Sequence, residues 1–76
     1  MNSQYRKHLI LPATYRDPSI GDWTASAHIE FTEKLTVHTV VLKPADVFQT
    51  EMQAEKYIIQ RAKEWIDNRL RQIQIS

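Results

Sequence analysis

The sequence predicts one small α+β domain over residues 1–76, with a three-stranded antiparallel sheet followed by one long C-terminal amphipathic helix (β-β-β-α). Three observations predict this fold. Apolar and polar residues alternate strictly from Gly21 to Phe31, which is the pattern of a half-buried strand. Residues 50–76 lack glycine and proline and repeat apolar residues at helical spacing. A chain of 76 residues is also too short to divide into two domains.

The first predicted strand runs from Tyr5 to Leu11. Its apolar residues are flanked by Arg6, Lys7 and His8, and Pro12 ends it because proline cannot donate a hydrogen bond to a sheet. Residues 13–22 are rich in turn formers, so they predict a long loop before the second strand.

The second strand, Gly21–Phe31, leads through the polar break Thr32–Lys34 to a third strand, Leu35–Lys43, which is rich in β-branched residues. A break this short favours an antiparallel hairpin. Pro44, Ala45 and Asp46 end the third strand.

The helix begins near Thr50, whose hydroxyl can cap the first turn, with Gln53 three residues later as in a capping box. Its predicted end lies between Arg69 and Gln74. Asp67 and Arg71 have the spacing of a favourable i,i+4 ion pair. One arc of the helical wheel is apolar and consists of Ala54, Ile58, Ile59, Ala62, Trp65, Ile66, Leu70 and Ile73.

A sheet this small must cover its apolar face, and only the helix is available to do so. The sheet side of the predicted core consists of Leu9, Leu11, Trp23, Ala25, Ala27, Ile29, Phe31, Val37 and Val41. The helix side consists of Ile58, Ala62, Trp65, Ile66 and Leu70.

The opposite face of the sheet is then open, and we predict it to be the working surface. With a three-residue loop between the second and third strands, His28 lies opposite His38. The candidate binding face is then Arg6, His8, Thr24, Ser26, His28, His38 and Val40. A two-residue loop would turn the third strand over and bury His38 instead, because a slip of one residue inverts every side chain.

Composition excludes several classes of function. The chain has no cysteine, which removes disulfides and thiolate metal sites. It has no glycine-rich phosphate loop and no arrangement that indicates an active site, so we predict no enzyme, no catalytic residues and no cofactor. No apolar run approaches the ~20 residues that span a bilayer, and the first eight residues lack a signal peptide, which predicts a cytoplasmic protein without membrane contact.

A nucleic-acid partner is one alternative, because the predicted face carries Arg6, Thr24 and Ser26, residue types that contact phosphates. Two local segments resemble the DNA-binding domains of plant ethylene-response factors and the arm-binding domains of phage integrases, which also pair three strands with one helix. These segments are Trp23–Ala25 in a strand, and Phe48–Glu51 with Ala54 at the start of the helix. The resemblance implies DNA binding through the sheet. However, those families carry several arginines on that face, and this chain carries Glu30 there.

Metal binding by the three histidines is a remoter alternative, and their spacing matches no known zinc signature. Association fits better. Ile10, Val40 and Leu42 would place apolar groups on the open face, which is typical of a surface that binds a protein partner or forms a homodimer. The chain also resembles small uncharacterised bacterial proteins with a strand-rich first half and a helix containing a segment like Ala62–Asp67, and this resemblance implies no activity. The sequence therefore predicts a non-catalytic protein-interaction or homo-oligomerisation module.

Overall fold

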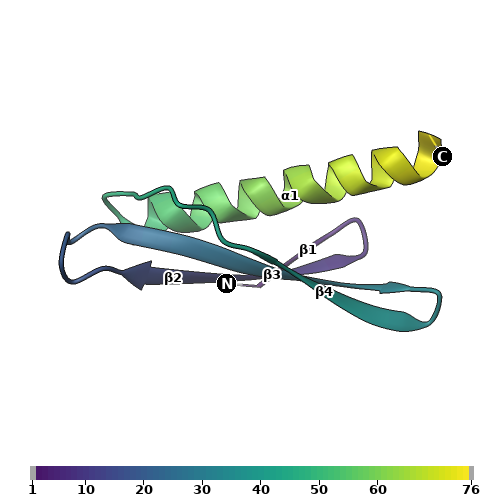
Figure 1. Cartoon of the computed structure of the whole chain (residues 1–76), viewed down its shortest axis with the longest axis horizontal. Helices are drawn as coiled ribbons and strands as arrows, with labels where there is room; N and C mark the ends of the chain where they lie inside the picture. The colour runs from purple at the N-terminus through teal and green to yellow at the C-terminus, as the bar shows by residue number, and fades with distance from the viewer. Residues whose placement is uncertain (1, 76) are drawn as a thin grey trace.

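The computed structural model describes residues 2–75 and has the predicted layers, an antiparallel sheet with one C-terminal helix packed on it. The sheet has four strands rather than three: β1 (Ser3–Tyr5), β2 (His8–Arg16), β3 (Trp23–Glu33) and β4 (Thr36–Leu42). Each strand pairs with its neighbour in the chain, in the order β1-β2-β3-β4. The helix α1 (Glu51–Ile75) lies along one side of the sheet, and the described residues place no element on the other side (Figure 1).

The fourth strand arises because the predicted first strand is divided by a turn at Arg6 and Lys7. Both residues have positive φ, at 49° and 67°, and the turn leaves Tyr5 opposite His8. Two consecutive residues with positive φ in a two-residue loop make a type I′ hairpin, which matches the twist of the strands. Neither residue is the glycine or asparagine that usually marks such a turn, so the sequence pattern did not reveal it.

The prediction that Pro12 ends a strand is also wrong, since β2 continues to Arg16. Pairing of Leu11 with His28 and of Ala13 with Ser26 continues on both sides of Pro12. Backbone groups of alternate residues point to opposite edges of a strand, and the register directs Pro12 away from β3. On that side β1 begins at Ser3, which pairs with Ile10, so β1 has no residue opposite Pro12. No hydrogen bond between strands is therefore lost.

The core is an alternation of alanine and isoleucine. On α1, Ala54, Ile58, Ala62 and Ile66 recur at every fourth residue and are completely buried. The small alanines let the helix approach the sheet closely. They meet a similar set on β2 and β3, which consists of Ile10, Ala25, Ala27 and Ile29.

Four residues of the predicted core are absent from it. Leu9 and Leu11 lie on the opposite face of β2, where Ile10 takes the buried position instead. Val37 and Val41 lie on the same outer face of β4 and are more than half exposed. The buried positions of β3 and of the helix are the part of the core that the sequence predicted correctly.

The helix begins where the sequence predicted, and it ends at Ile75, one residue beyond the predicted range. The amide of Gln53 donates a hydrogen bond to Thr50 Oγ1 at 3.2 Å, which is the predicted N-cap. Before it, Trp23 and Phe48 exchange two backbone hydrogen bonds of 2.7 and 2.8 Å, so Phe48 continues the sheet beside β3 after β4 has ended. This pairing fixes where the chain leaves the sheet and enters α1.

Candidate functional site

The sheet face that points away from α1, called the open face below, carries three of the predicted binding residues. Thr24, Ser26 and His28 alternate along β3 with the core residues Ala25 and Ala27, so they project from the opposite side. His28 is exposed there, whereas only 6% of the surface of Ser26 is exposed. The complete open face consists of Gln4, Leu9, Leu11, Ala13, Tyr15, Thr24, Ser26, His28, Glu30, Thr32, Val37, Thr39 and Val41.

The prediction that His38 and Val40 share this face is wrong. Glu33 pairs with Thr36 across a two-residue turn, Lys34 and Leu35, whose φ values are 52° and 64°. His38 therefore lies opposite Phe31, and Val40 lies opposite Ile29, on the side of α1. The two-residue alternative is the one that the chain adopts, although His38 at the sheet edge remains exposed.

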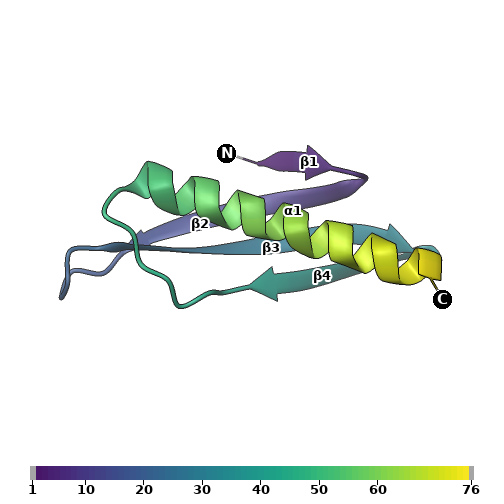
Figure 2. The same ribbon diagram turned by 90° about the horizontal axis from the view of Figure 1, so that it is seen from above.

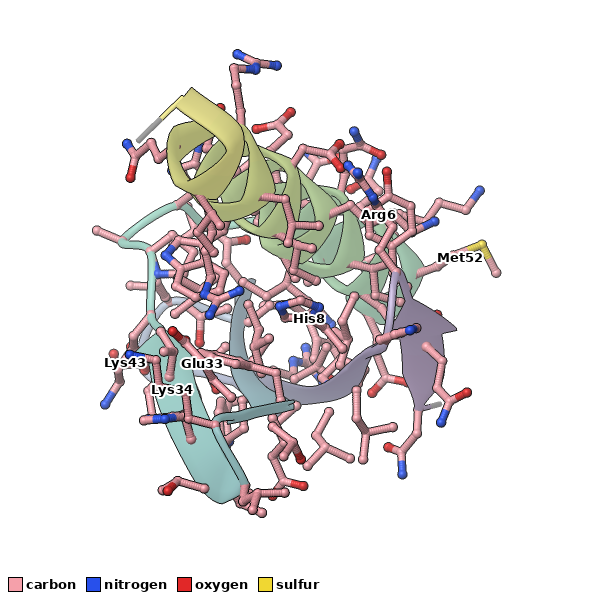
Figure 3. The ribbon with its side chains drawn as sticks, turned by 90° about the vertical axis from the view of Figure 1, so that its right-hand side faces the viewer. Arg6, His8, Glu33, Lys34, Lys43 and Met52 are labelled. Carbon is pink, nitrogen blue, oxygen red and sulfur yellow. The ribbon has the colours of Figure 1, made fainter. Side chains whose placement is uncertain are left out.

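Arg6 and His8 also lie away from the open face. Arg6, in the β1–β2 turn, extends toward the helix and contacts Asp67 Oδ1 through Nη1 at 2.8 Å (Figure 3). The hydroxyl of Tyr5 donates to the same carboxylate, 3.0 Å from each oxygen. Arg6 holds the pKa of Asp67 below its ordinary value, and the hydrogen bond from Tyr5 acts in the same direction.

His8 is buried between the sheet and α1 (Figure 3), with 4% of its surface exposed. Its Nδ1 lies 2.8 Å from the carbonyl oxygen of Arg6, while Nε2 is buried without a hydrogen-bond partner. The ring packs against Phe31, at 4.9 Å between centroids, and Phe31 stacks on His38 at 5.4 Å. One row of aromatic side chains therefore crosses all four strands. In this row Tyr5 pairs with His8, the ring of His8 packs on Phe31, and Phe31 pairs with His38.

This arrangement removes the basis of the metal hypothesis, because His28 is the only one of the three histidines on the open face. Among the residues that the structure describes, no cluster of three or more histidine, aspartate or glutamate side chains could hold a metal ion. No described residue therefore indicates a metal or cofactor site.

Sequence reasoning missed the apolar residues of the open face. Leu9 and Leu11 on β2 lie across β3 from Val37 and Val41 on β4, and Leu11, His28 and Val41 form one row across the sheet. The length of the turn between β3 and β4 could have revealed Val37 and Val41. If this turn is taken to have two residues instead of three, every odd-numbered residue of β4 lies on the open face.

Charge is sparse on the open face. Within residues 2–75 it carries one acidic residue, Glu30, and no lysine or arginine. Two arginines near it are engaged elsewhere: Arg6 contacts Asp67, and Arg16 donates through Nε to the carbonyl of Gly21 at 3.3 Å. A phosphate backbone would find no cationic side chain on this surface.

A second surface lies on the other side of the sheet, where the edge of α1 faces β4. It begins as a hollow of about 320 Å³ lined by Val41, Leu42, Lys43, Pro44, Arg61, Glu64, Trp65 and Asn68. A neighbouring hollow of about 360 Å³ shares Trp65 and Asn68 and extends to Phe31 and Val40. Beyond it, Arg69 lies over the ring of Phe31, 4.1 Å from the centroid, and forms an ion pair with Glu33. The ion pair between Arg69 and Glu33 therefore lies at the end of these two hollows that is nearer the β3–β4 turn.

The described part of the chain contains no helix with the length and apolar character needed to cross a membrane. Comparison with protein-family models, with curated proteins and with solved structures finds no match to this chain.

Proposed function

We propose that this chain is a non-catalytic self-association module in which two copies meet through their open faces. The observation that carries the proposal is the composition of that face. Leu9, Leu11, Ala13, Tyr15, Val37 and Val41 lie on it, uncovered by any described element, and no described lysine or arginine interrupts them. These side chains form two apolar groups, one on β2 and one on β4, with the polar row of β3 between them. Apolar side chains left uncovered in this way are typical of a protein–protein contact.

The shape of the chain leaves a large surface available for such a contact. The chain exposes 5624 Å², whereas a compact monomer of 9.0 kDa exposes about 4,850 Å². The molecule is elongated, with extents of 44 × 22 × 16 Å, and therefore exposes more surface than a compact domain does. The radius of gyration, 13.7 Å, also exceeds the value of about 11.4 Å expected for a compact domain of this length.

A two-fold contact between open faces would make a sandwich of two sheets, about 10 Å apart, with a helix on each outer side. Two small residues, Ala13 and Ser26, form one row of the face, between the larger side chains of the Leu11–His28 row and those of the Tyr15–Thr24 row. In a two-fold pair the larger side chains of one copy can fill the space over the small ones of the other. Glu30 of each copy can also accept a hydrogen bond from His28 of the other.

The test is the mass in solution, measured by light scattering after size-exclusion chromatography. We expect His28→Glu, which places a second acidic side chain next to Glu30 at the centre of the face, to halve the mass of the assembly that the unmodified chain forms. The control is Gln60→Glu, which makes the same charge change on an exposed position of α1 and should leave that mass unchanged.

Circular dichroism should show the same fold for all three chains. A monomeric unmodified chain at high concentration would contradict the proposal, and so would a mass that His28→Glu leaves unchanged. Mixed nucleic acid added at low salt should not change the elution of the unmodified chain. A salt-sensitive shift would favour nucleic-acid binding instead.

A further inference from the structure

The outer edge of β4 is an unprotected sheet edge. Figure 2 shows β4 as the last strand on its side, beside α1 rather than beneath it for most of its length, and β3 is its only described partner. Thr36, Val37, His38, Thr39 and Val41 are all exposed. The strand lacks the charged residues and proline that usually block pairing at a sheet edge, and it also lacks glycine.

The opposite edge of the sheet is protected in three ways. β1 has only three residues, the β1–β2 turn carries the charged side chains of Arg6 and Lys7, and Pro12 presents no N–H group beyond the end of β1. The same chain therefore blocks one edge and leaves seven uncharged residues free at the other. This asymmetry indicates that the β4 edge is used for pairing.

The register determines which backbone groups of β4 are available. Glu33 and Thr36 flank a two-residue turn and form a hydrogen-bonded pair, and such pairs alternate along an antiparallel ladder. His38, Val40 and Leu42 therefore direct their backbone groups to β3. Trp23 follows the same alternation along β3, because its backbone bonds to Phe48 on the side of β3 that faces β4. Val37, Thr39 and Val41 direct their N–H and C=O groups outward.

We infer that the β4 edge pairs antiparallel with β4 of a second copy, with Thr39 of both chains on the two-fold axis. In this register Val37 pairs with the second copy's β4 at the position of Val41, and all three outward-facing residues form hydrogen-bonded pairs. A shift by two residues in either direction would lose one of the three. The paired strands contain only uncharged residues, so no like charges meet in the ladder.

This contact is separate from the open-face contact, because it uses backbone groups at the edge instead of side chains on the face. Side chains of His38 and Val40 point to the side of α1, away from the open face. In the inferred ladder, His38 of each chain lies opposite the position of Val40 in the other. The two positions form a non-hydrogen-bonded pair with Cα atoms about 4.5 Å apart, within the range for a disulfide.

The test uses His38→Cys and Val40→Cys in a chain that has no cysteine of its own. We expect the two variants, mixed and oxidised, to form a disulfide-linked heterodimer that mass spectrometry identifies. Each variant alone should remain unlinked, because identical positions are then two residues out of register, about 8 Å apart, beyond the reach of a disulfide. A mixture of Val40→Cys with Val47→Cys, a half-exposed position outside the strand, is the control.

Absence of the mixed product, or equal linking in the Val47→Cys control, would overturn the inference. Linking of His38→Cys alone or of Val40→Cys alone would overturn the register. The experiment is repeated in chains that also carry His28→Glu. Persistence of the mixed product there supports an edge contact that stands without the open face, whereas its loss would show that the linkage arose from the open-face dimer.

Discussion

The hydroxyl group of Tyr5 lies 3.0 Å from both carboxylate oxygens of Asp67, which joins the first strand to the C-terminal half of the helix across 62 residues. Arg6 contacts the same carboxylate at 2.8 Å. One acidic side chain therefore holds the β1–β2 hairpin against α1. The expected Asp67–Arg71 pair within the helix is replaced by this long-range contact as the principal one, although the charge of Arg71 still lowers the pKa of Asp67.

Replacing this carboxylate should loosen the hairpin. Asp67→Asn keeps the shape of the side chain but removes its charge, so we expect a lower midpoint of urea unfolding and faster amide exchange in Ser3–Tyr5. Asp22→Asn, in the β2–β3 loop, is the control and should have a smaller effect. An unchanged exchange rate in β1 would mean that the Asp67 contacts do not hold this strand.

The acid dependence of stability follows from the same site. Arg6, and secondarily Tyr5, lower the pKa of Asp67, and Ser19 lowers the pKa of Asp17. A lowered pKa in the folded state gives stability that is present above the unfolded value of about 3.9 and is lost as the pH falls through the folded value. We expect the midpoint of urea unfolding to decrease as the pH drops below about 4. This decrease should be less steep in Asp67→Asn than in the unmodified chain. Equal slopes would contradict this assignment.

The alkaline side should depend on two tyrosines. Hydrogen bonds to Asp67 and to Asp46 raise the pKa of Tyr5 and of Tyr57, and Tyr57 lies 2.6 Å from its partner. A raised pKa gives stability that is present below the unfolded value of about 10 and is lost as the pH rises through the folded value. Ultraviolet titration of tyrosinate should therefore show a lower pKa for Tyr57 in Asp46→Asn than in the unmodified chain.

The β3–β4 turn offers a simple gain in stability. Leu35 has a φ of 64° and is 99% exposed, so it has the strain of the left-handed region without the benefit of burial. Leu35→Gly should stabilise the fold by roughly 0.5–1 kcal/mol, after the greater flexibility of glycine in the unfolded chain is taken into account. Leu35→Ala removes the same exposed side chain but keeps the strain, and it should change the free energy of unfolding little. A gain in both variants would mean that the side chain, not φ, is responsible.

The buried Nε2 of His8 has no partner, and a buried polar group without a hydrogen bond costs about 1–3 kcal/mol. His8→Phe keeps a ring against Phe31 and should raise the free energy of unfolding by about 1 kcal/mol. His38→Phe, at an exposed position on the other side of Phe31, is the control and should have little effect on monomer stability. Marked destabilisation by His8→Phe would mean that the hydrogen bond of Nδ1 with the carbonyl oxygen of Arg6 outweighs the cost of the unpaired Nε2.

The sequence was informative where one periodicity dominated. Strict alternation from Trp23 to Phe31 predicted the central strand and its buried face, and the helical spacing of Ala54, Ile58, Ala62 and Ile66 predicted the helix face. It was uninformative at Arg6 and Lys7 and at Lys34 and Leu35, because residues that tolerate positive φ poorly occupy both tight turns.

Those two turns determined the errors at the candidate site. An unrecognised turn at Arg6 joined β1 to β2 and assigned Leu9 and Leu11 to the core. A turn read as one residue too long moved His38 and Val40 to the open face and Val37 and Val41 to the core. A hairpin register cannot be inferred from strand composition when both faces carry β-branched residues, because either face can then be buried.

The order β1-β2-β3-β4 also bears on how this chain reaches its fold. Every strand pairs with the segment that precedes or follows it, so the sheet can grow by successive closure of hairpins, and no strand must wait for a distant partner. The contacts of α1 with β1 and β2 are the ones that span most of the sequence. We therefore expect the meander to organise early and the helix to dock late, so that fluorescence of Trp65 in the helix should change after that of Trp23 in the sheet.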